Sequence, residues 1–138
     1  MGSIDVPLPR YQTSGSAGLD LCAAISQPLL LAPGQRQLIP TGLCLEIPEG
    51  FEGQVRPRSG LALKHGVTVL NAPGTIDSDY RGEVGIVLIN HGSAHVGIEP
   101  LQRIAQLVVV AIAQAQIELV EALTATDRAA GGYGSTGS

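Results

Sequence analysis

Residues 67–90 read VTVLNAPGTIDSDYRGEVGIVLIN, and this stretch decides the fold. Residues 67–70 and 83–90 are β-branched, apolar runs of the length and composition typical of strands. The polar segment between them contains glycine and proline and predicts a hairpin tip that is longer than a two-residue turn. This concentration of polar side chains leaves two interpretations open, a solvated turn or part of an active site.

The same pattern continues along the chain, where short apolar runs are separated by glycine, proline, Asn or Asp. These runs are residues 19–24, 36–48, 52–57 and 103–120. Their spacing predicts an all-β fold, a jelly-roll-like sandwich or barrel. One short helix is expected at residues 59–66, SGLALKHG, with Ser59 as its N-cap and Gly66 at its C-terminal end.

The composition sets limits on the class of protein. The chain has 138 residues and a formal net charge of −4, which argues against a nucleic-acid backbone as its main partner. We expect one jelly-roll domain over residues 1–125 and a flexible, glycine-rich arm over residues 126–138. No secretory signal or membrane span is recognised, and Cys22 and Cys44 are expected to be buried free thiols. These features predict a cytoplasmic protein.

Residues 54–66, QVRPRSGLALKHG, predict an anion site. Arg56 and Arg58 are two residues apart, so an extended chain would point both side chains to one face. Ser59 and Gly60 then open the expected helix, whose free N–H groups favour an anion such as phosphate. The alternative is a surface strand end with an ordinary helix cap.

Four residues of the polar stretch and the strand after it suit a nucleotide. Asn71 can donate and accept hydrogen bonds at once, which suits the edge of a base. Asp77 beside a phosphate could activate water as a general base, and Tyr80 offers a flat wall for a sugar or base. Gly85 interrupts a good strand, as expected where a ligand or backbone approaches closely. The alternative is a hairpin whose polar side chains are simply solvated.

Further candidates lie in other segments. Asp20, between apolar strand residues, needs a partner such as arginine or Mg²⁺ with its waters, and Gln106 stands in an otherwise apolar run. Either residue could instead be a hydrogen-bonded polar group of the core. In residues 127–138, DRAAGGYGSTGS, Arg128 could clamp a phosphate and Tyr133 could stack on a base. The alternative for this segment is a disordered tail.

Taken in order, five segments resemble the five motifs of the trimeric deoxyuridine triphosphate nucleotidohydrolases, or dUTPases. They are AGLDLCAA (17–24), PRSGLA (57–62), NAPGTIDSDYRGE (71–83), RIAQL (103–107) and RAAGGYGSTG (128–137). The resemblance covers residues 8–137, and five motifs in order are far more specific than one. The fifth motif departs from the family pattern R-G-x-G-G-F-G, with Ala129 for the first glycine and Tyr133 for the phenylalanine. Ala129 matters only if its φ is positive.

The resemblance implies a homotrimer with shared active sites that hydrolyses dUTP to dUMP and diphosphate with Mg²⁺, keeping uracil out of DNA and supplying dUMP for thymidylate synthesis. It implies that Asp77 activates the water that attacks the α-phosphorus, and that Asp20 acts indirectly, through metal waters or a neighbouring arginine. Its phosphate-binding residues are Arg58, Ser59, Gly60 and Gln106, with Arg128, Ser135 and Thr136 at the γ-phosphate. Its other substrate-binding residues are Asn71, Thr75, Ile76, Tyr80, Gly85, Tyr133 and Gly134.

The same resemblance implies how deoxyuridine is selected. Asn71, Gly85 and the backbone of residues 75–77 read uracil by mimicking a base pair, and the tight hairpin excludes the methyl group of thymine. Tyr80 packs under the deoxyribose and leaves no room for a 2′-hydroxyl, while Tyr133 caps the base. Two alternatives stay open: a dCTP deaminase, which shares this fold, and a nucleotide-sensing trimer without catalysis.

Overall fold

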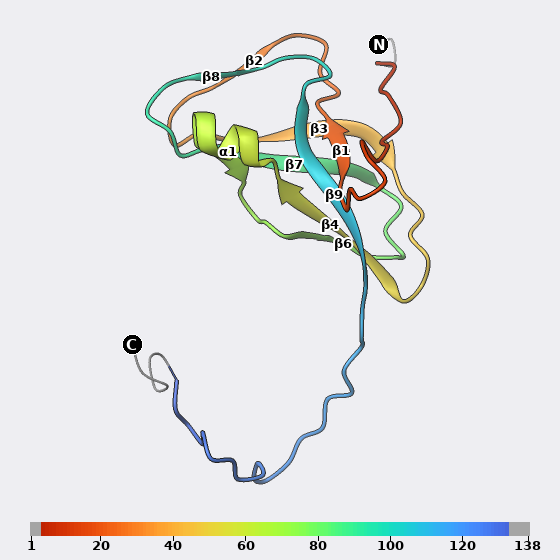
Figure 1. Cartoon of the computed structure of the whole chain (residues 1–138), viewed down its shortest axis with the longest axis vertical. Coiled ribbons are helices and arrows are strands. Elements are labelled where there is room, and N and C mark those ends of the chain that lie inside the picture. Colours follow the sequence, from red (N-terminus) through yellow and green to blue (C-terminus); the bar gives the residue numbers. More distant parts are fainter. Residues whose placement is uncertain (1–3, 133–138) are drawn as a thin grey trace.

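The computed structural model describes residues 4–132. In chain order its elements are β1 (Leu19–Cys22), β2 (Leu29–Leu31), β3 (Arg36–Cys44), β4 (Phe51–Pro57), α1 (Ser59–His65), β5 (Val67–Val69), β6 (Gly74–Ile76), β7 (Glu83–Asn90), β8 (Val96–Ile98) and β9 (Arg103–Ala111). Figure 1 shows the strands gathered into one body, with the chain after β9 leading away from it. Helix α1 packs beside β5, the strand that follows it in the chain. No helix of the described residues is long and apolar enough to cross a membrane.

The strands form three antiparallel sheets, in the orders β1-β9-β4-β6, β3-β7-β5 and β2-β8. One apolar cluster joins the first two sheets. It includes Leu21, Val55 and Ile104 from the four-stranded sheet and Ile39 and Ile86 from the three-stranded sheet. The side chains are aliphatic and alternate with outward-facing residues along each strand, as expected for packed sheets. The predicted all-β, jelly-roll-like architecture with one short helix is therefore confirmed.

The stretch at residues 67–90 folds as a hairpin with an inserted strand. β5 pairs with β7 as predicted, with Val67 opposite Asn90 and Val69 opposite Leu88. Between them the chain crosses to the other sheet, where β6 pairs with β4 and Ile76 lies opposite Gly53. The expected loop is therefore fastened to both sheets, which gives its polar side chains fixed positions.

Helix α1 occupies the predicted segment, but its N-cap is not the predicted one. Ser59 is the first helical residue, and Arg58 is the N-cap, with φ −94° and ψ 127° and no side-chain capping bond among the described atoms. Arg58 is the last extended residue, so the helix starts one residue earlier than expected. Gly66 ends the helix in the left-handed region with φ 68°, and its N–H donates to the carbonyl of Ala62 at 3.0 Å, as predicted.

The strand expected over residues 103–120 ends early, at Ala111, where it still pairs with Phe51. Residues 112–120 form no strand in the single chain, because beyond the contact from Ile112 N–H to the carbonyl of Gly50 at 2.9 Å they have no neighbouring strand. From there to residue 132 every residue is exposed, and the chain runs away from the body (Figure 1).

The two free cysteines occupy different environments. Cys22 is buried as predicted, whereas Cys44 is exposed, so the expectation for Cys44 was wrong. Cys44 ends β3 just after an irregularity that begins at Pro40 and shifts the pairing of β3 with β7, and this shift changes which face a residue presents. Burial, reinforced by the neighbouring Asp20 carboxylate, raises the pKa of the Cys22 thiol above its usual value.

Candidate active site

A pocket of about 210 Å³ lies where β6 crosses between the sheets, and we call it the base pocket. The predicted site residues that line it are Asn71, Thr75, Ile76, Asp77, Tyr80 and Gly85. Three of them belong to the crossing strand or follow it directly, and Gly85 belongs to β7. The insertion of β6 therefore brings together side chains that the sequence alone left along one loop.

Close contacts fix the walls of the base pocket. The side chain of Asn71 lies against Gly74, where a Cβ would stand 3.1 Å from Asn71 Nδ2. The N–H of Tyr80 donates to the carbonyl of Asp77 at 3.2 Å, which closes a turn directly after β6. The Tyr80 hydroxyl donates to the carbonyl of Glu83 at 3.1 Å. The aromatic ring is thus tied to the first residue of β7.

Asp77 is exposed and stands between two cavities. It lines the base pocket and also a larger, acidic cavity of about 950 Å³, which Asp79 lines as well. Glu83 is the other carboxylate in the lining of the base pocket, and its Oε1 accepts the N–H of Gly42 at 2.7 Å. Of the two carboxylates in this lining, Asp77 is the one that also borders the second cavity.

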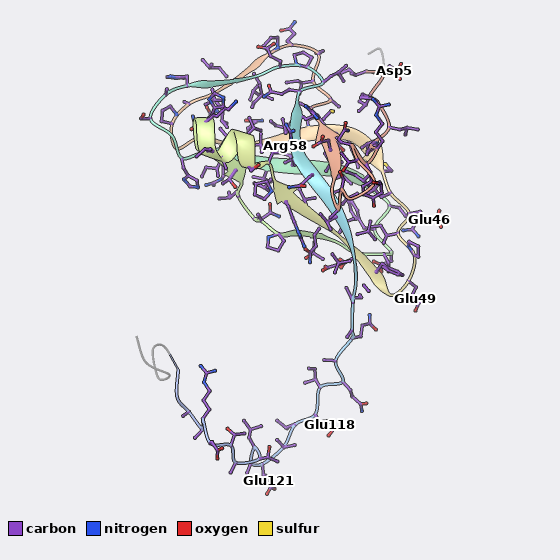
Figure 2. All side chains as sticks on the ribbon, in the orientation of Figure 1. Asp5, Glu46, Glu49, Arg58, Glu118 and Glu121 are labelled. Atoms are coloured by element: carbon purple, nitrogen blue, oxygen red, sulfur yellow. The ribbon has the colours of Figure 1, made fainter. Side chains whose placement is uncertain are left out.

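A second cluster of predicted residues surrounds Asp20. Oδ1 of Asp20 lies 3.1 Å from Arg58 Nε, and Oδ2 lies 3.0 Å from Arg103 Nη1. Arg58 also donates from Nη1 to the carbonyl of Arg103 at 3.2 Å. Figure 2 labels Arg58 on the body of the domain next to α1. Two guanidinium groups around one half-buried carboxylate leave a net positive charge, which suits an anion.

Gln106 belongs to the same end of the four-stranded sheet. It lies opposite Asp20 on β1 and opposite Arg56 on β4, and its Nε2 donates to the carbonyl of Pro57 at 3.0 Å. A Cβ at Gly18 would collide with the Gln106 side-chain oxygen, so a larger residue there would have to displace this side chain. Gln106 is therefore a fastened polar group beside the arginine cluster.

The start of α1 is open to solvent. Ser59 and Gly60 are exposed, and no described atom lies within 4 Å of a Cβ placed on Gly60. The guanidinium of Arg56 binds Gln54 Oε1, 3.0 Å from Nε, while Arg58 turns to Asp20, so the two arginines that the sequence grouped have different partners. None of these residues is part of the lining of the base pocket. The single chain holds the two clusters separately.

The arm carries the remaining predicted residues. Arg128 Nε donates to the carbonyl of Gly131 at 3.0 Å, and the N–H of Ala129 donates to the carbonyl of Thr126 at 3.0 Å. Ala129 has φ 43°, so the glycine that the family pattern places here is replaced at a position of positive φ. Figure 2 shows Glu118 and Glu121 on the segment that leads to this arm, away from the body. The predicted residues that lie outside the described range are Tyr133, Gly134, Ser135 and Thr136.

The described residues offer little for direct metal binding. In residues 4–132 no group of three or more His, Cys, Asp and Glu side chains is arranged to hold a metal ion. Both oxygens of Asp20 are already paired with arginines. This donor set fits an ion that is held mainly by phosphate oxygens and water, which is common for Mg²⁺.

Three residues of the site were missed by the sequence analysis, namely Gly18, Glu83 and Arg103. Each acts through a contact with a residue that is distant in sequence: Gly18 with Gln106, Glu83 with Gly42, and Arg103 with Asp20. The only feature of the sequence that could have pointed to them is their location, because all three stand inside segments already singled out for other residues.

Comparison with known proteins identifies the family. The dUTPase family model matches residues 5–137. The chain belongs to the dUTPase family. A deoxyuridine 5′-triphosphate nucleotidohydrolase of Anaeromyxobacter sp. (strain Fw109-5) is 62% identical over 130 residues, 94% of this chain and 87% of the relative.

Solved dUTPase structures share the fold. The dUTPase of Staphylococcus bacteriophage 80alpha with dUPNHPP is 27% identical, with a TM-score of 0.87 over 96% of this chain and 93% of that chain. A mutant of the dUTPase from phage phi11 of S. aureus, described with a structural Mg(II) ion, is 24% identical, with a TM-score of 0.77 over 85% of this chain and 91% of that chain. Because the phi11 dUTPase is so distant in sequence, its likeness supports only the fold.

Proposed function

We propose that this member of the dUTPase family hydrolyses dUTP to dUMP and diphosphate, with deoxyuridine in the base pocket. The observation that carries the proposal is that Asn71, Tyr80, Gly85 and Asp77 line one pocket of about 210 Å³. An amide, exposed backbone and an aromatic wall suit a base and a sugar, and a carboxylate stands at the rim. The reaction keeps uracil out of DNA and supplies dUMP for thymidylate synthesis.

The chemistry is attack by water on the α-phosphorus. Asp77 accepts the proton of that water, and negative charge grows on the phosphate oxygens as the bond to the leaving diphosphate breaks. Arg58, Gln106 and the N–H groups at the start of α1 supply donors for this charge. The contacts of Arg58 with Asp20 and with the carbonyl of Arg103 hold its guanidinium in place before substrate arrives.

Mg²⁺ is the proposed cofactor, and when bound it neutralises charge on the triphosphate. The arrangement of Asp20 supports an indirect role, because its oxygens are engaged by Arg58 and Arg103. The carboxylate keeps these two cations close together, and it can reach metal waters only from its remaining lone pairs.

A homotrimer with shared sites is proposed for two reasons. The lining of the base pocket includes none of Asp20, Arg58 and Arg103, so two chains can supply the two halves of one site. The segment of residues 112–125 that leads to the arm also carries strongly exposed apolar side chains, Ile117 at 88%, Leu119 at 103% and Leu123 at 88%. Side chains of this kind are usually covered by protein, which favours docking on another subunit. Arg128, Tyr133, Gly134, Ser135 and Thr136 would then close over a neighbour's nucleotide.

The alternatives fit less well. A dCTP deaminase needs an acid–base group at C4 of the base, but the base pocket has only Asp77 at its rim and Glu83, which already binds Gly42. A non-catalytic sensor would not need Asp77 and the arginine cluster together. A cytoplasmic location is proposed from the free thiols of Cys22 and Cys44.

The test is diphosphate release from dUTP, with dCTP, dTTP and UTP in parallel, each with Mg²⁺ and with EDTA. We expect rapid release from dUTP with Mg²⁺ and at least roughly 100-fold less from the other nucleotides, because the base pocket and Tyr80 select deoxyuridine. Ammonia release from dCTP would indicate a deaminase. Tight dUTP binding with neither product would indicate a sensor and overturn the proposal.

A further inference from the structure

A bulge in β3 lies directly behind the base pocket. Pro40 pairs with Gly85 and Cys44 pairs with Glu83, so residues 41–43 lie opposite Val84 alone. At the centre of the bulge, Gly42 has φ 69°, a left-handed conformation that favours glycine. Bulges of this kind redirect neighbouring side chains and are frequent beside active sites.

Two hydrogen bonds join the bulge to β7. The buried hydroxyl of Thr41 donates to the carbonyl of Val84 at 2.6 Å. The N–H of Gly42 donates to Glu83 Oε1 at 2.7 Å, a short bond to a charged acceptor. Because a bulge residue has no ladder partner of its own, the Glu83 carboxylate supplies the acceptor that the main chain lacks.

The main chain of Glu83 holds Tyr80 from the other side. The Tyr80 hydroxyl donates to the Glu83 carbonyl at 3.1 Å. A Cβ at Gly82 would collide with the ring and hydroxyl of Tyr80, so a larger residue at this position would have to displace the ring. The position of the ring therefore depends on where the first residue of β7 stands.

Glu83 is thus the point where the bulge and the pocket wall meet. Glu83, Tyr80 and Gly85 all line the base pocket. The Glu83 side chain reaches back to Gly42, and its carbonyl reaches forward to Tyr80. A shift of Glu83 would move the aromatic wall without removing any group that contacts the base.

We propose that Glu83 is a positioning residue for sugar selectivity: by holding the bulge at Gly42 it fixes the Tyr80 ring where a 2′-hydroxyl would otherwise fit. The inference rests on the proposed function, in which Tyr80 packs under the deoxyribose. Loss of the carboxylate leaves the Gly42 N–H unpaired, relaxes the bulge and frees the ring. The site then accepts ribonucleotides more readily.

The experiment compares Glu83→Ala with Glu83→Gln, which keeps an acceptor oxygen at the same reach. For each variant kcat and KM are measured with dUTP and UTP, and the dissociation constants of dUMP and UMP are measured by calorimetry. We expect Glu83→Ala to lower the ratio of kcat/KM for dUTP to kcat/KM for UTP by at least roughly tenfold, mainly through KM. In Glu83→Gln this ratio should stay within about threefold of its value in the unmodified protein.

Tyr80→Phe removes only the hydroxyl that binds Glu83 and should also narrow the preference. It carries the test if Glu83→Ala does not fold. Unchanged sugar preference in Glu83→Ala or in Tyr80→Phe would overturn the inference, as would equal losses for dUTP and UTP. If the unmodified protein neither hydrolyses dUTP nor prefers dUMP to UMP, the proposed function itself fails, and this inference fails with it.

Discussion

Asp77 and Asp79 are exposed carboxylates two residues apart, and only Asp77 borders the base pocket as well as the acidic cavity. We expect Asp77→Asn to lower kcat by at least about 100-fold, because a general base typically contributes about 10²–10⁴-fold. The amide keeps the shape of the carboxylate, so the dissociation constant for dUMP should stay within about threefold. Steady-state kinetics and calorimetry check both values.

Asp79→Asn is the matched control for this change, since it removes the same charge from the same turn. It should keep kcat within about threefold, because Asp79 is not part of the lining of the base pocket. If the Asp79 variant lost activity and the Asp77 variant kept it, the two roles would be reversed. If both kept full activity, the water would have another base.

A substitution at Gly60 can show whether glycine is needed there for phosphate binding or for folding. Its Cβ would meet no described atom within 4 Å, and it lies in the first turn of α1. Alanine is favoured over glycine in helices by up to about 1 kcal/mol, so Gly60→Ala should leave the melting temperature unchanged or raise it. The added methyl group would occupy the proposed phosphate space, and KM for dUTP should rise at least roughly tenfold.

Ala62→Gly is the control for Gly60→Ala, because Ala62 is exposed on the same helix. It should lower the melting temperature and leave KM unchanged, the opposite of the effect at Gly60. A Gly60→Ala protein with unchanged KM would show that no phosphate approaches the start of α1. Thermal unfolding and kinetics on the same preparations separate these outcomes.

At the scale of elements, the long strands were predictable and the short ones were not. Residues 83–90 form β7 with the predicted bounds, because the mainly β-branched apolar run within them gives a clear signal. β6 has three residues in a polar segment, and its pairing with β4 comes from tertiary packing that no local pattern carries. The early end of β9 at Ala111 has the same origin, since strand propensity alone does not supply a neighbouring strand.

In the candidate site, too, some features could be predicted from the sequence and others could not. Residue types predicted Asn71, Asp77 and Tyr80, because a base edge, a water and a sugar each need particular side-chain chemistry. The sequence could not predict that Glu83 fastens Gly42, because that contact depends on a two-residue shift in the pairing of β3 with β7. Residue types and their order suggested which side chains form the candidate site, whereas the way they are positioned depends on the register.

The turn at residues 126–131 of the arm contains a strained residue. Ala129 has φ 43°, where alanine is disfavoured by roughly 1 kcal/mol relative to glycine. We expect Ala129→Gly to favour the turn and to raise kcat/KM for dUTP by up to about fivefold, which is what 1 kcal/mol permits. Binding of dUMP, which has no γ-phosphate for the arm to grip, should not change.

Ala130→Gly is the control, because Ala130 is not among the residues of positive φ in the described chain. It adds the same flexibility without relieving strain, so kcat/KM should fall slightly or stay unchanged. Equal gains in both variants would indicate a general effect of flexibility in the arm. Equal losses would show that the closed arm does not use the conformation seen at Ala129.

At the scale of the whole molecule, residues 112–132 are exposed and lead away from the body, as expected if the arm acts on the pocket of another subunit. Two variants test whether it serves another subunit: Asp77→Asn, which keeps the arm, and a truncation that lacks residues 127–138. Each alone should have low kcat as a folded trimer. In mixed trimers, the arm of the first chain can close over the intact Asp77 of the second, so activity should return.

The size of this recovery distinguishes the possible geometries. If the Asp77 and the arm of one active site come from different chains, random mixing of the two variants in equal amounts gives about a quarter of the sites both an intact Asp77 and an intact arm. If each arm closed over its own chain, no mixed trimer would contain a complete site, and coexpression would restore nothing. Mixing the purified trimers without subunit exchange is the control, and it should show only the sum of the two low activities. Recovery only after coexpression would therefore place the arm and Asp77 of one active site on different subunits.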